Sequence, residues 1–204
     1  MKILKYILVI SVSIIFTACA STINVHNANK HFKVANDATK AGDWDTARRQ
    51  WAKTLVNAEL SDKVSPQNMA IINYEYGRAL GVQCFYEKSE EYLIRAYKLD
   101  LEINGPSFMD LVELARLNFD QKKFNESIPY FENAIRSLEE VKYDTKAPIG
   151  FRDILKEYSI ALKNVGSHGK VKMVDSRIKD INSKNTKGYS ITDRTPYGTQ
   201  CFKG

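Results

Sequence analysis

The side chains that most often carry chemistry in proteins are few in this chain, which has three cysteines and three histidines. His26, His31 and His168 form no two-ligand helical zinc motif. The chain contains no G-x-S-x-G elbow and no glycine loop of the kind that binds phosphate. Cys84 has no histidine nearby in the sequence that would activate it as a nucleophile. The sequence therefore predicts no enzyme, no catalytic residue, no metal site and no cofactor.

Cys19 stands out because of the residues that precede it. Lys2 and Lys5 come before an apolar run from Ile7 to Phe16, and small residues at 17 and 18 lead into the cysteine. Positive charge, a short apolar segment and small residues, in that order, are typical of an export signal. The apolar run has about half the ~20 residues that a membrane-spanning helix needs. These residues resemble the lipobox of bacterial lipoproteins.

The lipobox resemblance implies that residues 1–18 are a signal peptide and that Cys19 is acylated as the first mature residue. Residues 19–27 would be a polar tether. Ala20, which is not aspartate, implies an outer-membrane anchor facing the periplasm, or the outer face of the cell membrane if the organism has one membrane. The alternative is an ordinary signal peptide followed by an incidental cysteine.

The charge of the chain gives little support to a nucleic-acid partner. The formal net charge is +6, and loss of Lys2 and Lys5 with the signal peptide lowers it by two. The remaining basic residues are spread along the sequence and do not form one stripe. We therefore expect no nucleic-acid binding, and membrane attachment through acyl chains only.

Cys84 and Cys201 are the two cysteines that remain. An exported protein meets an oxidising compartment, where such a pair persists as a disulfide. Sequence spacing does not say whether their Cα atoms come within reach, so a disulfide and two free thiols stay equally open.

The middle of the chain repeats a pattern with helical spacing. An aromatic or other bulky residue is followed by a small residue three positions on, a bulky one four further and a small one three further. The three copies are Trp44, Ala47, Trp51, Thr54; then Tyr86, Ser89, Leu93, Ala96; then Phe124, Ser127, Phe131, Ala134. In each copy a small residue (Ala35, Gly77 or Ala115) also stands twelve positions before the first small residue.

This pattern resembles the tetratricopeptide repeat (TPR), in which small residues let two antiparallel helices approach closely. The resemblance implies an all-α solenoid with hairpins at about 28–61, 70–103 and 108–141. A weaker fourth hairpin at 152–185 would complete a repeat domain over 28–185. Residues 186–204 would form an irregular tail, which either docks on the helices or is disordered.

In TPR arrays the first helix of each hairpin lines a concave groove that binds a partner. The resemblance places a partner-binding groove in this chain at Phe32, Asn36, Tyr74, Arg78, Val112, Arg116 and Phe119. Aromatic residues and arginine dominate many protein interfaces, and arginine pairs with carboxylates, so this groove would suit an extended or helical peptide with some acidic character. The open alternative is that Tyr74 and Phe119 pack between hairpins and that the arginines are ordinary surface.

Together these observations predict a lipid-anchored periplasmic scaffold that binds an envelope protein or peptide segment. TPR lipoproteins of this kind act in pilus assembly and cell-wall machinery. The alternative is a ligand-binding accessory of a transporter, which would need an enclosed apolar pocket. The sequence does not indicate the oligomeric state.

Overall fold

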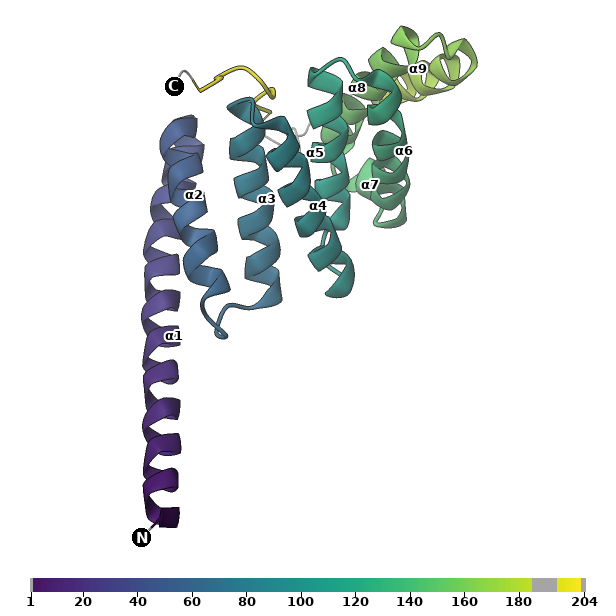
Figure 1. Ribbon diagram of the computed structural model, residues 1–204. Helices are drawn as coiled ribbons and strands as arrows, with labels where there is room; N and C mark the ends of the chain where they lie inside the picture. The colour runs from purple at the N-terminus through teal and green to yellow at the C-terminus, as the bar shows by residue number, and fades with distance from the viewer. Residues whose placement is uncertain (1, 185–193, 203–204) are drawn as a thin grey trace.

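The computed structural model describes the backbone of residues 2–184 and 194–202, and side chains from Ser21 onward within those ranges. The described chain is all helical and contains no strand (Figure 1). Its helices are α1 (Lys2–Ala41), α2 (Trp44–Glu59), α3 (Pro66–Val82), α4 (Tyr86–Glu102), α5 (Ser107–Asp120), α6 (Phe124–Glu140), α7 (Tyr143–Lys146), α8 (Pro148–Asn164) and α9 (His168–Ser183). The predicted all-α solenoid is confirmed.

The same turn closes four helical hairpins. Gly42, Cys84, Lys122 and Gly166 have φ angles of 72°, 72°, 61° and 73°, just after α1, α3, α5 and α8. At each turn the following N–H donates to a carbonyl five residues back, at 2.9–3.0 Å. This is the Schellman arrangement, which satisfies carbonyls at a helix C-terminus. Its recurrence at equivalent positions identifies four structural repeats, in one of which a cysteine occupies a position that favours glycine.

Small residues hold the two helices of a hairpin close together. Ser89 donates its hydroxyl hydrogen to the carbonyl of Gly77 at 2.7 Å, which joins α4 to α3. A Cβ atom at Gly77 would lie 2.9 Å from Leu93 Cγ and 3.1 Å from the Leu93 backbone nitrogen. Ala35 and Ala115, the equivalent residues of the neighbouring hairpins, are completely buried. The periodic small residues in the sequence therefore mark the sites of close helix approach.

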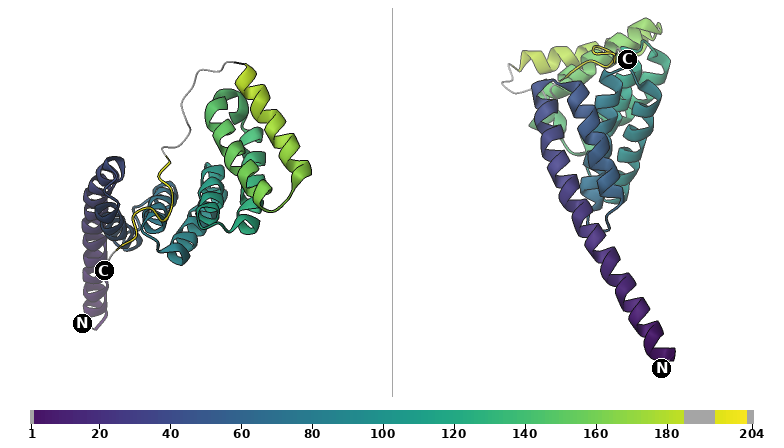
Figure 2. Two further views of the ribbon diagram at one scale, coloured as in Figure 1. Left: turned by 90° about the horizontal axis from the view of Figure 1, so that it is seen from above. Right: turned by 60° about the vertical axis from the view of Figure 1, so that its left-hand side comes forward.

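The hairpins follow one another around an arc (Figure 2). The first helix of a hairpin contacts the first helix of the next, α3 with α5 and α5 with α8. Residues 110–118 of α5 are all buried, and they contribute to the apolar clusters on both sides of the helix. Because each hairpin covers the apolar face of its neighbour, the solenoid has one continuous core.

The segment predicted as a polar tether, residues 19–27, is helical in the structure. Residues 21–27 belong to α1. Ser21 and Ser61 hydroxyl oxygens are 3.0 Å apart, and the Asn24 amide donates to the carbonyl of Leu60 at 3.1 Å. The helix extends beyond its apolar pattern because these polar side chains find partners in the α2–α3 loop. The side chain of Cys19 lies outside the described residues, and its lipidation stays a prediction.

The fourth hairpin also starts at a different residue. It comprises α8 and α9, so it begins at Pro148 and not at residue 152. Proline suits this first helical position because its missing N–H has no intrahelical partner there. The short α7 lies in the linker that precedes it. Of the predicted tail, residues 194–202 are described, and 186–193 lie outside the described residues.

A membrane-spanning helix is not found in the part of the chain whose side chains are described.

We expect Gly77→Ala to lower the free energy of unfolding by about 1–3 kcal/mol, because its Cβ would force α3 away from Leu93. Gly169→Ala, in α9, is the matched control. A Cβ there meets nothing within 4 Å, and alanine favours a helix more than glycine does. Urea unfolding followed by circular dichroism measures both variants, and equal midpoints would contradict the close-approach role of Gly77.

Candidate functional site

A row of alternating charges crosses the inner helices α3, α5 and α8. Glu113 Oε1 accepts a hydrogen bond from Arg116 Nη1 at 3.2 Å, and Glu113 Oε2 lies 3.8 Å from Arg78 Nε. Arg116 Nε also donates to Glu157 Oε2 at 2.8 Å. The row therefore links three successive hairpins through ion pairs.

The centre of this row is shielded from water. The side chains of Glu113 and Arg116 are 7% and 5% exposed. Burial raises the pKa of Glu113, but Arg78, Arg116 and the Tyr197 hydroxyl outweigh it and hold that pKa below its usual value. Burial lowers the pKa of Arg116, but the carboxylates of Glu113 and Glu157 raise it by more, so the pKa lies above its usual value. The carboxylate and the guanidinium are thus both held in their charged forms.

The tail (residues 194–202) completes the row. Arg194 donates from Nη2 to Asp120 Oδ1 at 2.7 Å, and its Nε lies 2.6 Å from Glu157 Oε1. Tyr197 donates its hydroxyl hydrogen to Glu113 Oε2 at 2.6 Å and its backbone N–H to Asp120 Oδ2 at 2.8 Å. Tyr197 is buried by these contacts. Of the two alternatives for the tail, the described residues show the docked one.

A disulfide and backbone hydrogen bonds hold the tail at the C-terminal end of α3. Cys84 and Cys201 are bonded, with their Cα atoms 5.0 Å apart. The N–H of Gly198 donates to the carbonyl of Gly81 at 3.1 Å. A Cβ atom at Gly81 would lie 2.3 Å from Tyr197 Cδ1, so a glycine is needed where the tail crosses α3. Figures 1 and 2 show the tail crossing the end of α3.

Three of the predicted groove residues need correction, because they do not face an open groove. Arg78 is paired within α3 to Glu75 at 3.0 Å, and Arg116 is enclosed between two carboxylates. Val112 is 3% exposed and belongs to the core. The interpretation of both arginines as contacts for an acidic partner fails because carboxylates of this chain already neutralise them.

The predicted aromatic groove residues are all partly buried and pack against the core. Phe119 packs edge-on against Phe124 and Phe131, and Phe32 packs edge-on against Trp51. Tyr74 also lines an open cavity. Asn36, on α1, is half-buried and lies away from that cavity.

Sequence reasoning missed the acidic members of the row and both tail residues, namely Glu113, Glu157, Asp120, Arg194 and Tyr197. A signal for part of the set was present. Glu75 and Glu113 each stand three residues before an arginine, a spacing that places opposite charges on one helix face. The tail contacts had no such signal, because Asp120 and Glu113 lie 74 to 84 residues before their tail partners. Glu157 likewise lies in α8, apart in the sequence from Arg194 of the tail.

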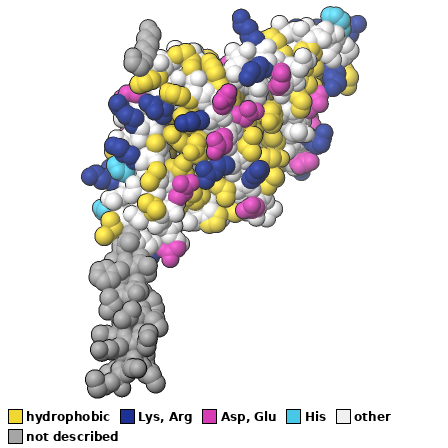
Figure 3. Space-filling view, viewed as in Figure 1, with side chains coloured by type: hydrophobic (Ala, Val, Ile, Leu, Met, Phe, Trp, Pro, Cys, Tyr) yellow, Lys and Arg dark blue, Asp and Glu magenta, His cyan; other side chains and the backbone are white. Residues whose placement is uncertain are grey.

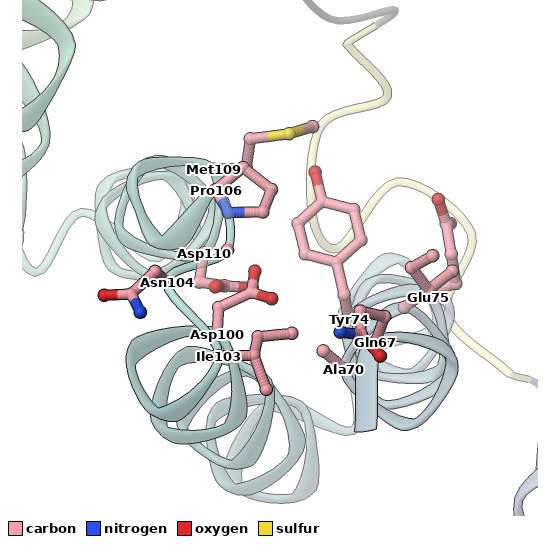
Figure 4. Close-up of a pocket in the computed structure, with 12 residues that line it drawn as sticks. Gln67, Ala70, Tyr74, Glu75, Asp100, Ile103, Asn104, Pro106, Met109 and Asp110 are labelled. Atoms are coloured by element: carbon pink, nitrogen blue, oxygen red, sulfur yellow. The ribbon is translucent and has the colours of Figure 1, made fainter. Parts of the chain in front are cut away.

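The concave face remains open beside the N-terminal half of α3. A cavity of about 440 Å³, which we call the α3–α5 cleft, lies between α3, the end of α4 and the start of α5. The residues that line it are Gln67, Ala70, Ile71, Tyr74, Glu75, Asp100, Ile103, Asn104, Gly105, Pro106, Met109 and Asp110. The carboxyl groups of Asp100 and Asp110 lie next to each other and face Tyr74 across the cleft (Figure 4).

The two carboxyl groups of the cleft are electrostatically unusual. Asp110 is 1% exposed, and no described residue donates a hydrogen bond to its Oδ2. Burial, followed by repulsion from Asp100, raises the pKa of Asp110 to about 8. Burial also raises the pKa of Asp100. Gly105 makes room for the pair, since a Cβ there would lie 2.4 Å from Asp100 Oδ1.

The described surface offers no group of side chains suited to holding a metal ion. Within the described ranges, no group of three or more histidine, cysteine, aspartate or glutamate side chains is placed to hold a metal ion. On the face shown in Figure 3, acidic and basic side chains are interspersed, with apolar side chains between them.

Comparisons with known proteins support the fold. No protein-family model and no curated protein matches the chain. Two crystal structures of the nearly identical TPR-like repeats of a Podosopora anserina protein, described as a kinesin light chain, are similar to it. One of them carries a single substitution. They have TM-scores of 0.62 and 0.61 at 12% identity, covering 78% and 79% of this chain and 76% and 77% of theirs. The crystal structure of MamA protein has a TM-score of 0.48 at 14% identity, over 78% of this chain and 94% of that one. The similarity to the two Podosopora anserina structures shows that the chain has a TPR-like fold.

We expect Arg116→Met to lower the free energy of unfolding by about 3–5 kcal/mol, because it removes the guanidinium that pairs with both buried Glu113 and half-buried Glu157. Lys156→Met is the control, since its ion pair with Asp153 is exposed and contributes about 0–1 kcal/mol. Thermal or urea unfolding compares the two variants. Equal losses of stability would mean that the buried row does not hold the hairpins together.

We expect Asp110→Asn to stabilise the protein more at pH 8 than at pH 5. Because the pKa of Asp110 is raised to about 8, the folded state binds more protons than the unfolded state between about pH 4 and 8. Stability of the native chain therefore falls as pH rises through this window, and asparagine, which does not ionise, abolishes that loss. Asp180→Asn, at an exposed site in α9, is the control. A stabilisation that is the same at both pH values would contradict the assignment.

Proposed function

We propose that this chain is a non-enzymatic, lipid-anchored scaffold that binds another envelope protein through the α3–α5 cleft. The observation that carries the proposal is the division of the concave face. The tail and its ion pairs cover the C-terminal end of α3, whereas the cleft beside the N-terminal half is open. In a TPR-like array this is the surface on which an extended or helical segment would lie.

Two features support a location outside the cytoplasm. Residues 1–19 have the pattern of a lipoprotein signal, and the disulfide between Cys84 and Cys201 is of a kind that persists in oxidising compartments. We place the protein at the outer membrane facing the periplasm, or at the outer face of the cell membrane in an organism with one membrane. Acyl chains on Cys19 would supply the attachment.

The structure of α1 changes the form of the proposed anchor. A mature chain that begins at Cys19 has only two residues before Ser21, which is buried against the α2–α3 loop. The acylated end would therefore hold that end of the solenoid close to the membrane. A short link of this kind raises the effective concentration of a membrane-bound partner.

The non-enzymatic character of the scaffold is supported by the disulfide that Cys84 forms. Cys84 is bonded to Cys201. A thiolate, not a disulfide, is the reactive species in nucleophilic catalysis.

A ligand-binding accessory of a transporter is the second candidate. It is favoured by the docked tail, which closes part of the concave face and leaves a cavity within the size range of small-molecule sites. Native mass spectrometry of the protein purified from its own envelope separates the candidates, because this function requires a bound small molecule and the scaffold requires a bound protein.

The scaffold predicts a position-specific crosslink. We expect a photo-crosslinking amino acid at position 71, in the cleft, to capture one protein partner in intact envelopes. The same amino acid at position 160, on α8, is the control, because Ile71 and Ile160 are both 46% exposed. Adducts at 160 but not at 71 would contradict the choice of surface.

The proposed lipid anchor predicts a change of location. We expect Cys19→Ser to move the folded protein from the membrane to the soluble fraction, as measured by fractionation of the envelopes.

A further inference from the structure

The α3–α5 cleft contains a buried carboxyl oxygen that has no hydrogen-bond partner among the described residues. Asp110 is almost completely buried, it lines the cavity, and its Oδ2 receives no hydrogen bond from the described residues. A buried carboxyl oxygen without a hydrogen-bond partner is unfavourable. An N–H group brought by a ligand would remove that cost.

The charge around Asp110 specifies the sign of the missing group. Asp100 faces the same cleft, and Glu75 stands at its rim. None of the residues that line the cleft is lysine, arginine or histidine. The nearest arginine on α3, Arg78, is already paired with Glu75 and Glu113. Two neighbouring acids without a cation complement an ammonium or guanidinium group.

The walls of the cleft specify what carries that cation. Ala70, Ile71, Ile103, Pro106 and Met109 are apolar, and the ring of Tyr74 faces the two carboxyl groups (Figure 4). Long basic side chains place an apolar stem along such surfaces and a charge at the end. A cavity of about 440 Å³ also has room for an apolar neighbour of the basic residue.

We propose that the α3–α5 cleft binds a lysine or arginine side chain from a segment of the partner protein, with Asp100 and Asp110 receiving its charge. This inference rests on the proposed scaffold function and specifies the chemistry of the partner. It also reverses the polarity predicted from the sequence, since the open part of the concave face selects a basic partner and not an acidic one.

Binding of the cation would be coupled to a proton. In the empty cleft Asp110 retains a proton near neutral pH, because burial and Asp100 raise its pKa to about 8. Glu113 on α5 raises that pKa further. Tyr74 and Glu75, both on α3, are the other titratable groups that line the cleft, and burial raises the pKa of each. A bound cation stabilises the ionised carboxyl, so binding releases a proton and affinity rises as pH increases toward 8.

The probe for the test is a capped peptide, acetyl-Gly-Leu-Lys-Leu-Gly-amide, titrated into the full mature chain. We expect a saturable shift of the Met109 methyl resonance, at least about tenfold weaker binding to Asp110→Asn, and tighter binding at pH 8 than at pH 6. Gly105→Ala, which displaces the Asp100 carboxyl, should weaken binding similarly. Asp180→Asn should bind as the native chain does. Equal binding by native chain and Asp110→Asn would overturn the inference.

Two further probes separate charge from stem and peptide from free amine. A peptide with norleucine in place of lysine keeps the stem without the charge, and equal binding of this peptide would overturn the cation site. Butylammonium carries the charge without a peptide, and binding as tight as that of the lysine peptide would overturn the commitment to a protein partner. If the crosslink from position 71 is unchanged in Asp110→Asn, the scaffold stands and the basic-residue inference fails.

Discussion

The arrangement of the concave face depends on the ion pairs and the hydrogen bond that the buried carboxylate of Glu113 makes. It lies on α5, the helix that is buried along most of its length, and it receives charge or hydrogen bonds from α3, α5 and the tail. A carboxylate this far from water is tolerated only when it is fully paired. The positions of Arg78, Arg116 and Tyr197 are therefore mutually dependent, and the two hairpins and the tail have to meet in one geometry.

This dependence explains why the concave face has two unlike ends. Where the tail crosses α3, polar groups satisfy one another, and the disulfide to Cys201 keeps them together. Beside the N-terminal half of α3, the carboxyl pair of Asp100 and Asp110 has no internal cation. Pairing between charged groups of the chain closes the C-terminal end of α3 to partners. The cleft beside the N-terminal half of α3 lacks such pairing and can receive a partner.

The helical repeats were predictable because their signal is local and repeated. Small residues such as Gly77 and Ala115 recur at fixed helical spacing, and the same turn follows each first helix. Element boundaries were less predictable. Residues 21–27 carry no apolar periodicity, yet they are helical because the α2–α3 loop supplies partners for their polar side chains. The candidate site was the least predictable part, since the sequence does not distinguish an exposed arginine from one that is paired with a carboxylate of the same chain.

The sequence by itself determined the all-α solenoid, the order of its hairpins and the export pattern around Cys19, because each of these depends on residues near one another in the chain. Only the tertiary structure decided that Arg78 and Arg116 are enclosed and that Cys84 meets Cys201. It also decided that Asp100 and Asp110, from different helices, share an open cleft. Coulomb and hydrogen-bond energies depend on distance in space and on exclusion of water, and neither quantity is encoded by spacing along the chain.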